Sequence, residues 1–229
     1  MNIQDERTIR VIGEKSFNHL QQKHVMVFGL GGVGGYVIEG LVRAGIKEFT
    51  IIDNDVVQES NLNRQIIALN ATIGRKKVDV VKERILEIRQ DAIVHCYDMF
   101  YLPEVVREEF FDNIDYIVDA IDTMTAKIDL VMKAKALNIP IISCMGTGNK
   151  IHPEMLMITD LYKTEMCPVC KVMRRELKKR EVKHLKVLFS KEEPIKTQTR
   201  TPGSVSFVPS VAGLLIASEV IKDFMKEVL

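Results

Sequence analysis

The chain has 229 residues, of which 46% are hydrophobic and 28% are charged. This balance is typical of an ordinary globular protein and excludes a chain that is disordered over most of its length. The formal net charge is only +1, which excludes a global electrostatic attraction to nucleic acid or membrane. Any such partner has to be sought in local clusters of charge.

The first ten residues, MNIQDERTIR, are polar and charged, so no signal peptide is predicted. The most apolar late stretch covers residues 204–221 and is interrupted by Pro209 and Ser218, so no membrane span is predicted. The four cysteines, at positions 96, 144, 167 and 170, do not form a disulfide framework. We therefore expect a reducing, cytoplasmic location.

Strand-like and helix-like patterns alternate over the first two-thirds of the chain. Short apolar runs predict strands over residues 24–30, 48–53, 92–98, 115–122 and 139–146. Helical spacing predicts helices over residues 31–45, 74–90, 103–111 and 125–138. This alternation predicts an α/β fold of the Rossmann-like, doubly wound kind, with a mostly parallel sheet and helices on both faces.

The pattern changes after Gly148, where we predict a C-terminal extension. It contains a strand over residues 155–162, a helix over 168–181, a polar, mobile loop over 190–206 and a helix from near Pro209 to the end. We interpret residues 1–229 as a single domain. Its nucleotide-binding part covers about residues 1–150, and its substrate or dimer part covers about residues 151–229.

A glycine-rich turn joins the first predicted strand to the first predicted helix. It contains Gly29, Gly31, Gly32 and Gly34, which would let the backbone approach phosphate oxygens at the positive end of the helix. Asp53 ends the second strand, where a carboxylate can accept hydrogen bonds from ribose hydroxyls. These features fit a dinucleotide site as well as an ATP site, and a tight turn without ligand is the third alternative.

Polar groups suited to a triphosphate follow the second strand. They are Asp55, Asn61, Arg64 and Gln65, and Lys77 follows at the start of the next helical pattern. A triphosphate needs cations that neutralise its charge and steady the leaving pyrophosphate, which Arg64 and Lys77 can supply. We therefore predict an ATP site. Plain surface charges, a nicotinamide-dependent oxidoreductase and a non-catalytic nucleotide-binding module remain the alternatives.

Two carboxylates, Asp119 and Asp122, flank the end of the fourth predicted strand. A carboxylate at this edge of a parallel sheet points into the ligand crevice. Mg²⁺ prefers one or two protein carboxylates together with phosphate oxygens. We assign Asp122 to Mg²⁺, with helix capping as the alternative.

These residues together resemble the ubiquitin-activating-like superfamily, and the resemblance covers essentially the whole chain. Its most specific part is D-x-D-x-V-x-x-S-N-x-x-R-Q from Asp53 to Gln65, joined to GLGGVG and VDAIDT. The resemblance implies an adenylating enzyme that binds ATP and Mg²⁺. It also implies that Arg10, Arg64, Lys77 and Asp122 are catalytic. The arginines of the N-terminal R-x-x-R, Arg7 and Arg10, would reach the ATP of a neighbouring subunit, which implies a homodimer.

Within the superfamily, the chain looks most like the tRNA threonylcarbamoyladenosine dehydratases. The shared features are Arg10-Val-Ile-Gly-Glu, NRQI at 63–66, VDAID, T-D-L-x-K-T at 159–164 and SFVPSVAGLLIAS at 206–218. The resemblance implies that ATP activates the carboxylate of threonylcarbamoyladenosine in tRNA. Cyclisation then expels AMP and leaves a dehydrated nucleoside.

A basic segment at residues 171–191 gives independent support for a tRNA partner. It contains nine Lys or Arg and two Glu, on a chain that is otherwise nearly neutral. Such a concentration of positive charge suits contacts with a phosphate backbone. A solvated helix face is the alternative.

Cys167-Pro-Val-Cys170 is a single C-x-x-C pair. Activators of sulfur-carrier proteins typically carry two such pairs that bind zinc, and no cysteine follows Cys170. Four-coordinate zinc would need Cys96, Cys144 or a second subunit, so we interpret the pair as two ordinary thiols. Activation of the C-terminal glycine of a small sulfur-carrier protein remains the alternative function, and docking of a sulfur-transfer protein stays open.

Overall fold

The computed structural model describes residues 3–102, 108–199 and 201–228. Its core is one seven-stranded sheet in the order β3-β2-β1-β4-β5-β7-β6, with every neighbouring pair parallel except β7 and β6. The strands are β1 His24–Phe28, β2 Glu48–Ile52, β3 Ile93–Tyr97, β4 Tyr116–Asp119, β5 Ile141–Cys144, β6 Leu156–Asp160 and β7 Lys186–Ser190. The predicted doubly wound, mostly parallel α/β fold is confirmed.

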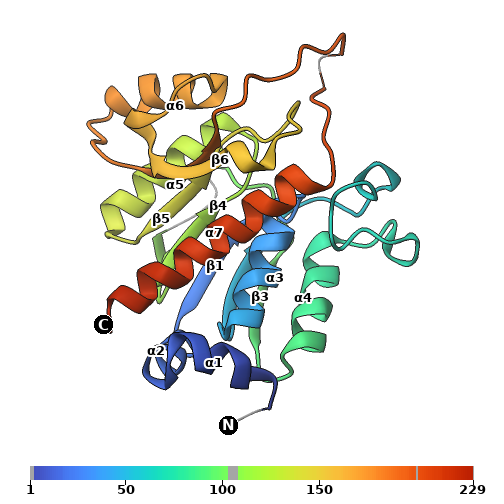
Figure 1. The fold of residues 1–229 in the computed structure, drawn as a ribbon, viewed down its shortest axis with the longest axis vertical. Coiled ribbons are helices and arrows are strands. Elements are labelled where there is room, and N and C mark those ends of the chain that lie inside the picture. Colours follow the sequence, from blue (N-terminus) through green and yellow to red (C-terminus); the bar gives the residue numbers. More distant parts are fainter. Residues whose placement is uncertain (1–2, 103–107, 200, 229) are drawn as a thin grey trace.

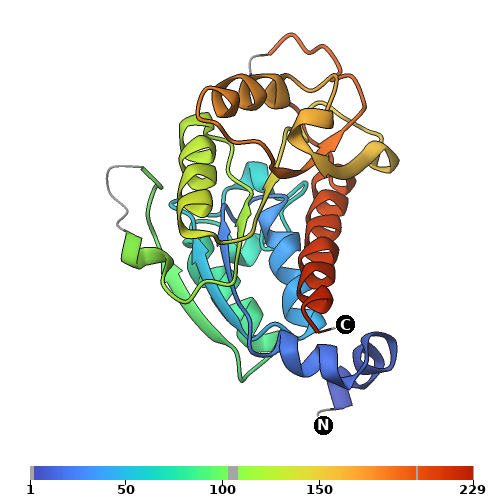
Figure 2. The same ribbon diagram turned by 90° about the vertical axis from the view of Figure 1, so that its left-hand side faces the viewer.

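Helices cover both faces of this sheet (Figures 1 and 2). One face carries α3 Gly34–Ala44, α4 Lys77–Ile88 and α7 Phe207–Lys226, and the other carries α5 Met124–Leu137 and α6 Pro168–Lys178. The helices α1 Glu6–Ile12 and α2 Glu14–Leu20 lie beyond the amino ends of the central strands. Short 3-10 helices cover Ile3–Asp5, Glu59–Asn61, Asn70–Thr72, Glu108–Phe111, Pro153–Met155 and Leu161–Lys163.

The alternating pattern produces this fold because strands that are buried on both faces are mostly apolar. All five residues of β1 are buried, and so are all four of β4. The long helix α7 buries one side, with Val208, Ala212, Ile216, Val220 and Phe224 recurring every four residues. It packs on α3 and the sheet, so its apolar residues belong to the core of the chain itself.

One element was missed from the sequence, and several bounds differ. The strand β7, Lys186–Ser190, lies between β5 and β6 and has four buried residues, although no strand was predicted there. The sequence pattern that could have predicted this strand is short: after Lys186 it consists of only three apolar residues and one serine, at the end of the basic segment. The described part of the predicted loop, residues 191–199 and 201–206, contains no helix or strand.

The predicted helix over 103–111 lies partly outside the described residues, and its last four residues form the 3-10 helix Glu108–Phe111. The predicted helix over 74–90 begins only at Lys77, because Val56 and Lys76 form an isolated antiparallel bridge. None of the described helices combines the length and the apolarity that a membrane crossing requires.

Candidate nucleotide-binding site

The carboxyl ends of the parallel strands surround a cleft of about 560 Å³. This is the edge of a doubly wound sheet at which ligands bind. The cleft brings together residues that lie far apart in the chain, from Phe28 to Pro209. Its lining includes these residues of the predicted site: Gly29, Gly31, Gly32, Asp53, Asp55, Asn61, Arg64, Gln65, Lys77 and Asp122.

The glycine turn takes a shape that side chains would prevent. Gly29 has φ +85°, and an added Cβ would lie 2.7 Å from the carbonyl oxygen of Ala120. At Gly34 an added Cβ would lie 1.8 Å from the carbonyl oxygen of Gly29. Gly34 is the first residue of α3 and does not line the cleft, so its part is to let the helix start against the turn. The start of α3 therefore faces the cleft with its positive end.

Asp53 ties the glycine turn to the segment after β2. One carboxylate oxygen accepts a hydrogen bond from the Leu30 N–H at 2.7 Å, and the other accepts from the Asp55 N–H at 2.8 Å. Burial raises the pKa of Asp53, and the ammonium group of Lys77, 3.9 Å away, opposes that rise. The carboxylate thus lies at the cleft wall with its backbone partners already in place.

Two cations enter the cleft from the segment that follows β2. Lys77, at the start of α4, is buried and its Nζ lies 2.7 Å from Oδ2 of Asp55. Arg64 donates to the Ser60 carbonyl at 2.9 Å and to Asn63 Oδ1 at 2.8 Å. Arg64 is thus held by neutral groups and can attract an anion in the cleft, whereas Lys77 is paired with Asp55 and, at 3.9 Å, with Asp53.

Asn61 and Gln65 complete this wall of the cleft. Asn61 is buried, and its Oδ1 accepts from the Gln58 N–H at 3.1 Å, which caps the short helix Glu59–Asn61. Gln65 is also buried, and its Oε1 is without a hydrogen-bond partner among the described residues. A buried polar atom without a partner costs about 1–3 kcal/mol. A ligand that donates a hydrogen bond to Gln65 would remove that cost.

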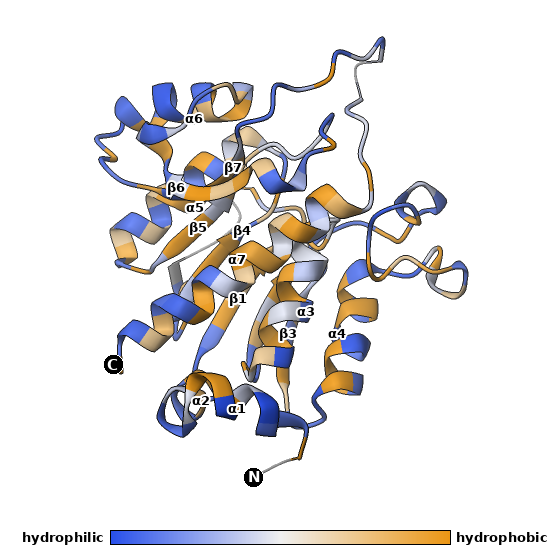
Figure 3. Ribbon diagram, in the orientation of Figure 1, coloured by the Kyte–Doolittle hydropathy of each residue, from blue (hydrophilic) through white to orange (hydrophobic). Residues whose placement is uncertain are grey.

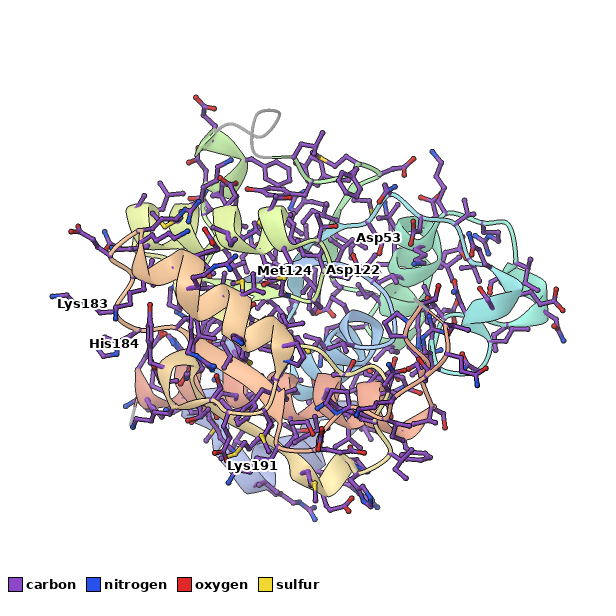
Figure 4. All side chains as sticks on the ribbon, turned by 90° about the horizontal axis from the view of Figure 1, so that it is seen from above. Asp53, Asp122, Met124, Lys183, His184 and Lys191 are labelled. Atoms are coloured by element: carbon purple, nitrogen blue, oxygen red, sulfur yellow. The ribbon has the colours of Figure 1, made fainter. Side chains whose placement is uncertain are left out.

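Asp122 and Asp119 play different parts. Asp122 is exposed at the cleft and lies on the same side of the molecule as Asp53 when seen from above (Figure 4). The N-cap of α5 is Thr123, without a side-chain capping bond, so Asp122 does not act as the helix cap. A single exposed carboxylate beside a phosphate-binding turn fits the preference of Mg²⁺.

Asp119, by contrast, is fully buried and does not line the cleft. It pairs with Nζ of Lys127 at 3.0 Å and accepts a hydrogen bond from the Ser143 hydroxyl. Lys127 also donates to the carbonyl oxygen of Ile121 at 2.9 Å. Of the two carboxylates at this edge of the sheet, Asp122 therefore lines the cleft and Asp119 does not. Nothing in the sequence indicated that Lys127 is buried, because the side chain of a lysine in a helix is usually exposed.

The polar segment before α7 forms another part of the cleft that the sequence did not reveal. Pro202, Gly203 and Ser204 line it. The Gly203 N–H donates to Asn149 Oδ1 at 2.6 Å, and the Asn149 N–H donates to the Gly203 carbonyl at 2.8 Å. Asn63 Nδ2 donates to the Ser204 carbonyl at 3.0 Å. The segment therefore joins the part of the cleft formed by the segment after β2 to the loop after β5.

A second cavity of about 450 Å³ adjoins the cleft and shares Asp122, Thr147 and Gly148 with it. Most of its wall is apolar, and Cys167 lies in that wall as the N-cap residue of α6. The pKa of Cys167 is lowered to about 5, chiefly by a hydrogen bond from the Cys170 thiol and then by nearby backbone N–H groups. The C-x-x-C pair thus lies beside the cleft and not on a remote surface.

Arg10 is not brought to the cleft of its own chain. It lies exposed on α1, where it pairs with Glu6, at the end of the molecule opposite the carboxyl ends of the strands (Figure 1). Arg7 is exposed on the same helix. Either arginine could reach a nucleotide only in another copy of the chain.

The basic segment is divided by the fold into an outer and an inner part. Arg174 turns inward and donates to the Thr164 carbonyl at 2.8 Å, and Lys186 contacts Glu219 at 2.8 Å. The other cations of the segment are exposed: Lys171, Arg175, Lys178, Lys179, Arg180, Lys183 and Lys191. Figure 3 shows α6 as largely hydrophilic on its outer side, and Figure 4 shows Lys183 projecting from the outer end of the molecule. Glu176 binds three of these cations and reduces the local charge.

Comparison with known proteins agrees with this site. The ThiF family matches residues 4–227. The tRNA threonylcarbamoyladenosine dehydratase of Bacillus subtilis is 37% identical over 98% of this chain and 96% of that protein. The crystal structure of E. coli tRNA N6-threonylcarbamoyladenosine dehydratase, TcdA, in complex with AMP superposes with a TM-score of 0.92 at 33% identity, over 97% of this chain and 94% of that one. Its complex with ATP gives 0.91 at 32% identity, over 97% and 93% of the two chains. This chain belongs to the ThiF family.

Proposed function

We propose that this protein is an ATP-dependent tRNA threonylcarbamoyladenosine dehydratase. The observation that carries the proposal is the cleft itself, which combines a phosphate-binding turn with two cations, a ribose-side carboxylate and an exposed carboxylate for a metal. The similarity to dehydratases over nearly the full length of both chains supports it. Residues 1–229 act as one adenylation domain, with the nucleotide part at about 1–150 and the substrate or dimer part at about 151–229.

ATP occupies the cleft in this proposal. The backbone of Gly29, Gly31 and Gly32 and the start of α3 hold phosphate oxygens, and Asp53 accepts hydrogen bonds from the ribose. Lys77 exchanges its 2.7 Å contact with Asp55 for a contact with the triphosphate. This exchange is possible because the Asp55 carboxylate is exposed and can be solvated by water instead. Support for a ligand on this wall comes from Gln65, which lines the cleft and whose buried Oε1 has no hydrogen-bond partner among the described residues.

Arg64, Asn61 and Lys77 stabilise the charge that develops on the leaving pyrophosphate. Asp122 would hold Mg²⁺ in the cleft. When bound, it neutralises phosphate charge and makes the phosphorus a better electrophile. Asp122 suits this part because its carboxylate is exposed between the two cavities and does not cap α5.

The reaction follows from the position of the second cavity. A substrate carboxylate that enters past Asp122 meets the nucleotide from the side opposite β3. The carboxylate attacks the α-phosphorus, and pyrophosphate leaves with the electron pair of the broken P–O bond. The carbamoyl group of the same nucleoside then attacks the activated carbonyl carbon and forms a new bond to it, while the C–O bond to AMP breaks. AMP leaves with the former carboxylate oxygen, and the carbamoyl group loses an N–H proton to solvent. Because the nucleophile and the acyl adenylate are parts of one nucleoside, the ring closure is intramolecular and its effective concentration is high.

The tRNA body lies on the exposed cations of α6 and the turn that follows it. These side chains, among them Lys178 and Lys183, are on the outer surface and can contact phosphates without moving the core. Arg174 and Lys186 take no part, because both are engaged with groups of the same chain. We place the protein in the cytoplasm, where its tRNA substrate is found.

The active form is a homodimer. Arg10 is exposed on α1, away from the cleft of its own chain, and in this proposal it reaches the triphosphate bound by a second copy. A closed two-fold dimer gives two such shared sites, because each chain offers both the arginine and the cleft.

The proposal is tested by incubating the purified protein with ATP, Mg²⁺ and tRNA that carries threonylcarbamoyladenosine, followed by mild digestion and mass spectrometry of the nucleosides. We expect an ATP-dependent loss of one water from that nucleoside and release of AMP and pyrophosphate. Omission of ATP is the control. An unchanged nucleoside, together with pyrophosphate exchange stimulated by a carrier protein that ends in Gly-Gly, would instead establish sulfur-carrier activation.

A further inference from the structure

A cluster of His24, Glu48 and His95 lies on β1, β2 and β3, toward the side of the sheet opposite the nucleotide cleft. His24 and Glu48 are the first residues of their strands, and His95 is the third residue of β3. Among the residues that the structure describes, these three form the one group of His, Cys, Asp or Glu side chains whose ligand atoms all lie within 4.8 Å of one another. The proposed ATP reaction does not use them. Their arrangement therefore calls for an explanation of its own.

Strand register places the three side chains on one face of the sheet. His24 is paired with Glu48 across β1 and β2, and Thr50 is paired with His95 across β2 and β3. Residues paired in register point to the same face, and so do Glu48 and Thr50, which are two positions apart. The three ligand-bearing side chains are therefore presented together by the rigid part of the fold.

The distances within the cluster suit a small tetrahedral cation. Glu48 Oε1 lies 3.5 Å from His24 Nδ1 and 3.2 Å from His95 Nε2. Zinc binds histidine nitrogen and carboxylate oxygen at about 2.0–2.1 Å, so neighbouring ligand atoms around a tetrahedral zinc are about 3.3 Å apart. The two contacts in the cluster bracket that separation, and the histidine rings lie 5.5 Å apart between centroids.

A supporting hydrogen bond orients the buried histidine. His24 Nε2 lies 2.8 Å from the Thr50 hydroxyl, which is itself buried. When Nε2 carries the proton, it donates a hydrogen bond to the Thr50 hydroxyl oxygen, and the lone pair of Nδ1 is left for a cation. Metal-binding histidines are regularly fixed through their second nitrogen in this way. His95 is exposed and Glu48 half-buried, so a cation can enter from solvent.

We propose that His24, Glu48 and His95 bind a divalent transition-metal cation of the zinc class. Two imidazoles and a carboxylate suit zinc, cobalt and nickel and do not suit Mg²⁺, which prefers oxygen ligands alone. Three protein ligands leave a fourth position open to water. His24 and Glu48, though not His95, line a cavity of about 520 Å³ together with Gln22, Asp112, Asn113 and Asp115.

The test uses the full-length protein without a polyhistidine tag, freed of metal with a chelator and titrated with Co²⁺ while visible absorption is recorded. We expect one equivalent to bind with the spectrum of nitrogen and oxygen ligands, and Zn²⁺ to displace it. His95→Gln is expected to weaken binding by at least the ~10- to 100-fold that loss of a supporting hydrogen bond costs at such sites. Because His95 is exposed, this variant should keep the wild-type unfolding curve.

His152→Gln is the matched control, because His152 and Glu154 form an exposed histidine–carboxylate pair at 2.7 Å that lies outside the cluster. This variant should bind Co²⁺ like the wild type. Equal affinity in His95→Gln and the wild type would overturn the proposal, and so would failure of the wild type to bind Co²⁺ or Zn²⁺. Sulfur-to-cobalt absorption bands would place the ion at Cys167 and Cys170 and would overturn it as well. None of these results depends on dehydratase activity.

Discussion

The buried pair of Lys127 and Asp119 should be one of the strongest single determinants of stability in this chain. The Lys127 side chain is 2% exposed and that of Asp119 is 0% exposed, so neither charge is screened by water. Lys127→Met would keep most of the side-chain volume and leave the carboxylate buried without its cation. Breaking a buried pair in this way costs about 3–5 kcal/mol, a large share of the ~5–15 kcal/mol by which a domain is stable.

Urea unfolding followed by circular dichroism would measure this loss. Lys135→Met is the matched control on the same helix, because Lys135 is exposed and donates only to a backbone carbonyl; it should unfold like the wild type. The double variant Lys127→Met with Asp119→Asn should recover much of the lost stability, because the uncompensated charge is then absent. A Lys127→Met protein within about 1 kcal/mol of the wild type would refute the electrostatic argument.

Three further predictions concern the site. Arg10→Ala and Asp122→Ala should each lack ATP-dependent turnover, and an equimolar, re-equilibrated mixture should regain about a quarter of wild-type activity if sites are shared in a two-fold dimer; an inactive mixture would contradict sharing. Replacing Lys178 and Lys183 by alanine should weaken tRNA binding and lower its log–log salt slope by about one per lost phosphate contact, measured by filter binding at several salt concentrations. Cys167 should be alkylated by iodoacetamide at a rate that is nearly constant from about pH 6.5 to 8.5, because its pKa of about 5 leaves it a thiolate throughout that range; a rate rising about tenfold per pH unit would show an ordinary thiol.

Most of the fold and the main residues of the site could be predicted from local sequence patterns. The buried strands could be predicted from their apolar runs. The glycine turn lies between a predicted strand and a predicted helix, which is the usual position of a phosphate-binding turn. Arg64, Gln65 and Lys77 could be chosen because they follow the second strand at the same edge of the sheet. Ten of the predicted site residues line one cleft because parallel strands all end at that edge.

The elements that were missed depend on partners far away in the chain. The strand β7 has too few apolar residues to stand out, and its burial comes from insertion between β5 and β6. The cleft wall at Pro202 and Gly203 depends on hydrogen bonds with Asn149, which no periodicity in either segment encodes. Lys127 likewise looked like a surface residue of an amphipathic helix.

The sequence by itself determined the class of fold, the phosphate-binding turn and the set of polar residues around it, because these follow from local spacing and from the common direction of parallel strands. Only the tertiary structure decided which carboxylate lines the cleft. Asp119 and Asp122 are three positions apart in similar surroundings, yet Lys127 and Ser143 hold one in the core while the other stays exposed. The cluster of His24, Glu48 and His95 also needed the strand register, because three side chains from three strands become neighbours only when the sheet is assembled.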